Sequence, residues 1–106
     1  MPKYLLAVNY TLDGVRGLLA EGGSAREAAA RAAVESVGGT MESFFFAFGG
    51  TDVYVVADMP DNASAAAMAL AVGAGGGATT NTVALLTSAE VDAAAAKQVG
   101  YRAPGT

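Results

Sequence analysis

The chain of 106 residues contains no cysteine, no histidine and no tryptophan. Without cysteine the protein has no disulfide, no thiol nucleophile and no thiolate ligand for a metal. Without histidine it lacks the commonest general base and the commonest metal ligand, which excludes serine–histidine triads, zinc sites and haem sites with an axial histidine. We therefore expect neither a bound metal nor a cofactor.

Positive charge is also scarce, and the net charge is −4. The basic residues are scattered along the chain: Lys3, Arg16, Arg26, Arg31, Lys97 and Arg102. Because nucleic-acid binding needs clustered cations that neutralise phosphates, we expect no nucleic-acid partner. No apolar run approaches the roughly 18 residues that span a bilayer, and the first residues lack a cleavable signal pattern. We expect a cytoplasmic protein that does not enter a membrane.

Hydrophobic periodicity predicts four strands and four helices in a single domain of residues 1–106. The strands are expected at residues 3–11, 41–48, 51–59 and 79–86, and the helices within 12–23, 24–39, 60–77 and 87–100. With the two consecutive helices within residues 12–39 taken together, the order is β-α-β-β-α-β followed by a terminal helix. This order predicts an α+β, ferredoxin-like fold, with an antiparallel four-stranded sheet in the order 4-1-3-2 and helices on one face.

Capping patterns predict where three of the helices begin. Ser24 and Glu27 fit the capping box S-x-x-E, which places the start of the second helix at Ser24. Residues 87–90 repeat this pattern before the last helix. Asp61 or Asn62 is suited to cap the third helix.

The stretch "FFFAFGGTDVYVV" predicts a β-hairpin around a two-residue turn at Gly49 and Gly50. With this turn Phe45 lies opposite Tyr54, and both faces of the hairpin are apolar. The helices can cover one face, but Phe45, Tyr54 and Val56 remain on the other, and monomers rarely expose so large an apolar patch. A second copy packed face to face would cover it, giving a homodimer or a higher homo-oligomer. Alternatively, the chain's own tail or terminal helix covers part of it.

The sequence resembles the GYD-domain family of small bacterial and archaeal proteins, through "YLLAVNYT", "GGSAREAA", "VESVGG", "FFFAFGGTDVYVVADMPDNASAAA" and "LLTSAEVDAA". The resemblance implies a dimeric α/β barrel. The wider superfamily includes cofactor-free monooxygenases, lactone isomerases, haem enzymes and small-molecule-sensing domains, so the fold does not give the function. The family is named for a Gly-Tyr-Asp element, and this chain has Gly50-Thr51-Asp52 instead.

Two carboxylates are candidates for function. Asp52, after the predicted turn, either lies at the mouth of a pocket or caps the turn through backbone amides. Glu42 lies in a strand rich in phenylalanine. It can act as a base if it faces inward, but not if it lies at the wet end of the strand.

Four residues with polar ends complete the candidate site. Asn9, Tyr10 and Tyr54 either orient a phenol or an enolate, or they belong to the core. Arg16 either binds a ligand carboxylate or is a solvated helix residue. We predict that a pocket lies between sheet and helices near the C-terminal end of the first strand, under residues 11–23 as a lid, with Tyr10 and Arg16 against the ligand.

Two functional hypotheses remain open. The first is a binding or assembly module, a homo-oligomer that holds a small apolar or acidic ligand without catalysis. The absence of histidine and cysteine favours it. The second is a cofactor-independent isomerase or monooxygenase acting on a small aromatic or enolisable substrate. A buried Glu42 or Asp52 beside a tyrosine would favour the enzyme, whereas exposed or turn-forming carboxylates would favour the module.

Overall fold

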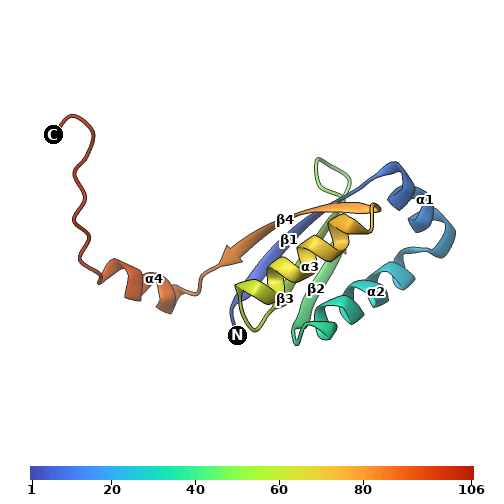
Figure 1. The fold of residues 1–106 in the computed structure, drawn as a ribbon, viewed down its shortest axis with the longest axis horizontal. Coiled ribbons are helices and arrows are strands. Elements are labelled where there is room, and N and C mark those ends of the chain that lie inside the picture. Colours follow the sequence, from blue (N-terminus) through green and yellow to red (C-terminus); the bar gives the residue numbers. More distant parts are fainter.

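The computed structural model describes all residues 1–106, which form four strands and four helices (Figure 1). The elements are β1 (Lys3–Tyr10), α1 (Leu12–Glu21), α2 (Gly23–Ser36), β2 (Thr40–Phe46), β3 (Val53–Asp58), α3 (Asn62–Ala74), β4 (Ala78–Leu85) and α4 (Ser88–Ala95). The strands form one antiparallel sheet in the order β2-β3-β1-β4. The predicted α+β, ferredoxin-like fold and its strand order are confirmed.

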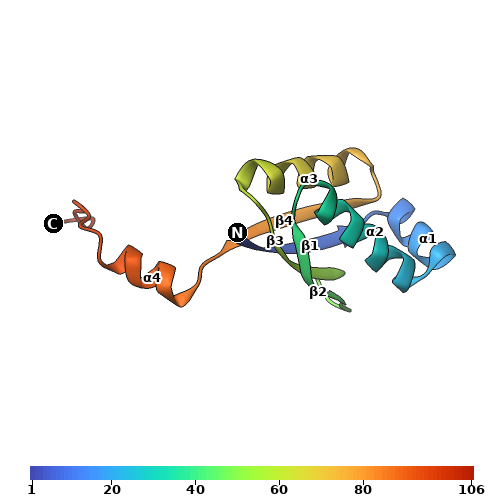
Figure 2. The same ribbon diagram turned by 90° about the horizontal axis from the view of Figure 1, so that it is seen from below.

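Helices α2 and α3 lie on one face of the sheet, and the other face is left open (Figure 2). Strand alternation divides the side chains between the two faces. The helix-covered side holds the core, which consists of Tyr4, Leu6, Val34, Met41, Val53, Val55, Ala57, Met59, Ala65 and Met68. The uncovered surface, hereafter the open face, carries Leu5, Ala7, Phe45, Tyr54, Val56 and Val83. On it Phe45 is 69% exposed and Tyr54 42% exposed.

The β2–β3 hairpin has the predicted register but not the predicted turn. Phe45 pairs with Tyr54, as expected. However, neither Gly49 nor Gly50 adopts the positive φ that a tight type I′ turn requires, and residues 47–52 form an open connection. An extra residue, Glu42, interrupts the ladder of β2 as a bulge. The bulge shifts the alternation of side chains, so that Met41 turns to the core.

Two of the three predicted helix starts are confirmed and one is wrong. Asp61 caps α3 by accepting from the Ser64 backbone N–H at 2.8 Å. The predicted capping box precedes α4, with both of its hydrogen bonds formed. Ser24 caps nothing, because α2 begins one residue earlier, after Gly22 at φ 85°. Gly22 ends α1 and starts α2, since its N–H donates to the Leu18 carbonyl and its carbonyl accepts from the Arg26 N–H.

Residues 86–106, hereafter the arm, project from the end of β4 away from the rest of the chain (Figure 1). Every residue of the arm is exposed. The alternative that the tail or terminal helix covers the chain's own open face is therefore not realised. None of the helices combines the length and the apolar character needed to cross a membrane.

Candidate functional site

Three of the predicted site residues meet at the C-terminal end of β1. The Asp52 carboxylate accepts from the Tyr10 backbone N–H at 2.9 Å. The Asp52 backbone N–H donates to the Val8 carbonyl at 2.9 Å and to the Asn9 side-chain oxygen at 3.2 Å. Asp52 thus holds the end of the β2–β3 connection against β1. This contact differs from the predicted cap of the turn, which was one of the two roles expected for Asp52. These bonds fix the backbone from which the Tyr10 side chain projects.

The start of α1 is held against the loop that precedes β4. The Thr11 backbone N–H donates to the Gly77 carbonyl at 3.0 Å, and its hydroxyl donates to the Gly76 carbonyl at 2.8 Å. Gly14 sits so close to this loop that a Cβ atom there would lie 1.8 Å from the Gly77 oxygen. Only glycine permits this approach, which closes one end of a cavity between α1 and α3.

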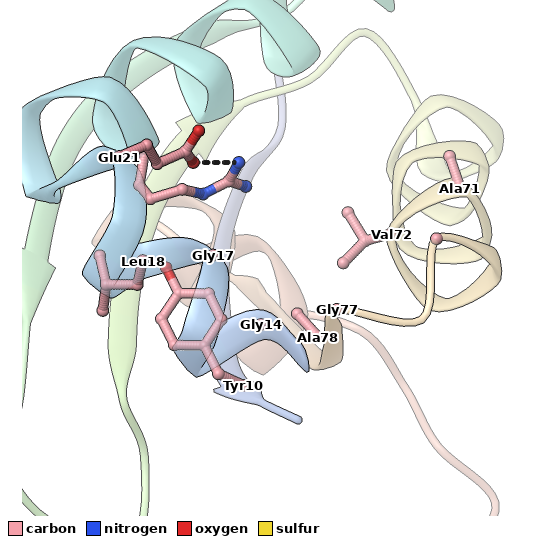
Figure 3. A pocket seen from close by; sticks show the side chains of 11 residues that line it. Tyr10, Gly14, Gly17, Leu18, Glu21, Ala71, Val72, Gly77 and Ala78 are labelled. Carbon is pink, nitrogen blue, oxygen red and sulfur yellow. Dashed lines mark hydrogen bonds and ion pairs between the residues drawn. The ribbon is translucent and has the colours of Figure 1, made fainter. Parts of the chain in front are cut away.

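This cavity, hereafter the Arg26 cavity, has a volume of about 320 Å³ (Figure 3). Its walls come from β1, α1, the start of α2, the end of α3 and the start of β4. They include Tyr10, Leu18, Glu21, Arg26, Val72 and Ala78, together with four glycines. In Figure 3 the Tyr10 ring projects from β1 with its hydroxyl toward α1, opposite Val72 and Ala71 of α3. The cavity lies where a pocket was predicted from the sequence.

Arg26 is the cation of the cavity. Its guanidinium donates to the Glu21 carboxylate at 3.0 Å, while its Nε is buried without a hydrogen-bond partner. The hydrogen bond to Glu21 is the main cause that raises the pKa of Arg26; burial opposes the rise, and the neighbouring Tyr10 side chain adds to it. Arg26 therefore stays charged at any physiological pH.

A second, more apolar cavity of about 430 Å³ adjoins the end of β1. Tyr10 and Leu18 line both this cavity and the Arg26 cavity. Its remaining wall includes Phe46, Phe48 and Asp52. Tyr10 thus lies between a cavity with a cation and a cavity with mainly hydrocarbon walls.

The family model described as GYD domain matches residues 4–95. The chain belongs to the GYD-domain family. No curated protein and no solved structure matches it. The GYD-domain match begins within β1 and ends at the last residue of α4, so it includes the helix of the arm.

The Gly50-Thr51-Asp52 sequence lies in the connection between β2 and β3 of this GYD-domain protein. Asp52 of Gly50-Thr51-Asp52 makes the contacts to β1 described above. Thr51, the residue before it, is half-buried. The aspartate therefore has a structural role here that does not need a tyrosine at the preceding position.

The other predicted site residues lie apart from the end of β1. Arg16 is exposed on α1 and lines no cavity. Glu42 is exposed in the bulge at the opposite end of the sheet, where it pairs with Lys3. Hydrogen bonds to Glu42 and then to Asp58 raise the pKa of Lys3. Tyr54 lies on the open face, whereas Tyr10 projects from the helix-covered side.

From the sequence Arg26 was missed as a site residue and was named only as one of the scattered basic residues. The two glycines between Glu21 and Ser24 are the available signal, since a sharp reversal there returns the start of α2 toward the end of α1. No group of three or more aspartates and glutamates is placed to hold a metal ion.

Proposed function

We propose that the protein is a homodimeric, cytoplasmic module that binds a small acidic or phenolic molecule in the Arg26 cavity. The observation that carries the ligand proposal is the Arg26 guanidinium in the cavity wall, where only its bond to Glu21 is formed. A guanidinium has five N–H donors, so donors remain for a ligand oxygen. The cysteine-free composition suits the reducing cytoplasm.

The walls of the cavity limit the size and chemistry of the ligand. A volume of about 320 Å³ lies at the lower end of the range for small-molecule sites, so the ligand is small. A guanidinium binds carboxylates and phenolates through charge-assisted hydrogen bonds. The Tyr10 hydroxyl adds a second polar group, while Leu18 and Val72 offer apolar contact. A small aromatic acid combines these features.

Binding without catalysis has more support than the enzyme hypothesis. The candidate base Glu42 is exposed and ion-paired, far along the sheet from Tyr10. The Asp52 carboxylate, although it adjoins the second cavity, accepts a backbone hydrogen bond. Glu42 has no tyrosine beside it, and Asp52, although it lines the second cavity together with Tyr10, is tied to the β1 backbone by one of its two carboxylate oxygens.

The open face supports the homodimer. Its apolar side chains form a continuous patch across all four strands, and the helices leave it uncovered. Phe45→Glu should raise the dimer dissociation constant at least tenfold, because it places a charge in an apolar interface. Phe48→Glu is the matched control, since Phe48 is fully exposed at the hairpin tip. Sedimentation velocity showing a monomeric wild-type protein at micromolar concentration would contradict the dimer.

Calorimetric titration tests the ligand proposal. The probes are benzoate, 4-hydroxybenzoate and the neutral benzamide, each titrated into wild type, Tyr10→Phe, Arg26→Gln and Arg31→Gln. Arg31 is the matched control because it is an exposed arginine on the same helix. We expect the acids to bind and benzamide to bind weakly. Arg26→Gln should weaken acid binding about tenfold or more, which is the effect of losing one charged hydrogen bond.

Two outcomes would count against this site. Binding of the acids that is unchanged in Arg26→Gln and Tyr10→Phe places the ligand elsewhere. If none of the probes binds to wild type, the proposed specificity for aromatic acids is wrong. This result would leave the proposed homodimer untouched, because sedimentation tests it separately.

A further inference from the structure

The arm has no partner within its own chain. Its apolar side chains are largely exposed: Leu86 65%, Val91 51%, Val99 80% and Tyr101 74%. The hydrogen bonds of its loop and helix-end residues stay within the arm itself. The radius of gyration is 16.9 Å, against about 13 Å for a compact chain of this length. The arm accounts for this extension (Figure 1).

The helix of the arm is nevertheless well formed. Thr87 and Glu90 close both hydrogen bonds of the capping box, and the backbone N–H of Thr87 lowers the pKa of Glu90. An isolated helix as short as α4 is marginal in water, so its stability depends on packing against something else. The family match extends through α4, which shows that this helix is part of the domain.

The arm is continuous with the open face. Val83 and Leu85 lie on that face of β4, and Leu86 alone links the strand to the capping residue Thr87. A molecule that packs on the open face therefore also lies beside the root of the arm. Figure 2 shows the arm beyond the end of the sheet, past the end of β4.

The size of the open face leaves room for such a contact. Four strands of six to eight residues, about 4.8 Å apart and rising about 3.3 Å per residue, cover about 450 Å². A standard interface buries about 800 Å² on each partner. The sheet is smaller than this as a flat footprint, and the apolar residues of the arm are exposed surface next to it.

We infer that the arm packs on the second copy of the homodimer, so that the two copies exchange their C-terminal arms. This inference rests on the proposed homodimer. By two-fold symmetry each arm contacts the partner's body in the same way. The side of α4 that bears Val91 faces the partner, and the opposite side, which bears Ala93, faces solvent.

Sedimentation velocity on full-length variants tests whether contacts of the arm stabilise the dimer. Val91→Lys should raise the dimer dissociation constant about tenfold or more, because it replaces a buried apolar side chain with a charge. Ala93→Lys, on the other side of the same helix, should leave the constant unchanged. Neither substitution touches the body of the protein, so both variants should fold.

A mixed-labelling experiment tests the position of the arm. The chain has no cysteine, so Lys97→Cys provides one attachment point for a nitroxide. The tagged, unlabelled copy is mixed with untagged, ¹⁵N-labelled protein. If the arms are exchanged, amide signals from the sheet of the untagged copy will broaden. In a second sample the tagged copy itself carries ¹⁵N. If signals broaden only in this sample, the arm packs on its own body and the inference is wrong.

The outcomes separate this inference from the homodimer. A monomeric wild type contradicts both. A stable dimer that Phe45→Glu disrupts, but that shows no broadening between copies or no response to Val91→Lys, retains the homodimer and refutes arm exchange. Broadening between copies together with the selective effect of Val91→Lys supports it.

Discussion

Replacement of Gly14 by alanine tests whether close backbone approach positions α1 over the Arg26 cavity. The added Cβ would lie 1.8 Å from the Gly77 oxygen and 3.1 Å from the Tyr10 ring. To restore van der Waals contact, α1 and the loop must separate by about 1.5 Å. This movement breaks the two hydrogen bonds from Thr11 to the Gly76 and Gly77 carbonyls.

The expected loss of stability follows from these contacts. Overpacking costs about 1–3 kcal/mol, and each lost hydrogen bond about 0.5–1.5 kcal/mol. The higher helix propensity of alanine offsets up to about 1 kcal/mol. The free energy of unfolding should therefore fall by about 1–6 kcal/mol. A loss of about 3 kcal/mol, at a slope of about 2 kcal/mol per molar urea, lowers the denaturation midpoint by about 1.5 M.

Gly17→Ala is the matched control on the same helix. A Cβ at Gly17 meets no atom within 4 Å, so alanine should stabilise the protein by up to about 1 kcal/mol. Both variants must be measured at the same protein concentration, because dimerisation makes the midpoint depend on it. If Gly14→Ala were as stable as Gly17→Ala, the proposed role of the glycine contact would be wrong.

Three further predictions concern capping and composition. Ser24→Ala should change the free energy of unfolding by less than about 0.5 kcal/mol in urea denaturation, because this side chain caps nothing; a larger loss would contradict the observed start of α2. Asp61→Ala should destabilise the protein at neutral pH. The backbone and then the side-chain hydrogen bond of Ser64 lower the pKa of Asp61, so this stabilisation is complete above pH 3.8 and disappears as the pH falls through the lower folded pKa. Urea midpoints of wild type and variant should converge at low pH, and a constant difference would refute the cap. Elemental analysis should find no stoichiometric zinc, copper or iron, since the chain offers neither thiolate nor imidazole ligands.

Features that depend on nearby residues could be predicted from the sequence. Asp61 and Thr87 cap their helices because an N-cap needs only a side-chain oxygen and the next turn of backbone. The hairpin register follows from the alternation of apolar residues, so Phe45 and Tyr54 were correctly paired. The strand order follows from the general rules that govern βαββαβ chains.

Only the tertiary structure shows which arginine lies in the wall of the cavity. Both Arg16 and Arg26 lie on predicted helices close to β1 in sequence, and periodicity does not show which of them turns toward Tyr10. The left-handed conformation of Gly22 joins α1 to α2 and brings Arg26 to Glu21, leaving Arg16 in solvent. The same reversal makes Ser24 an ordinary helix residue, although its local pattern fits a cap.

The sequence by itself determined the elements, their order, their pairing and the surplus of apolar residues on the sheet, because each of these depends on local geometry and on strand alternation. Tertiary structure decided where the chain ends come to lie and which distant groups share a cavity. The close contact of Gly14 with Gly77 and the outward course of the arm are examples. Such contacts join residues far apart in sequence and depend on how whole elements pack, which no local pattern records.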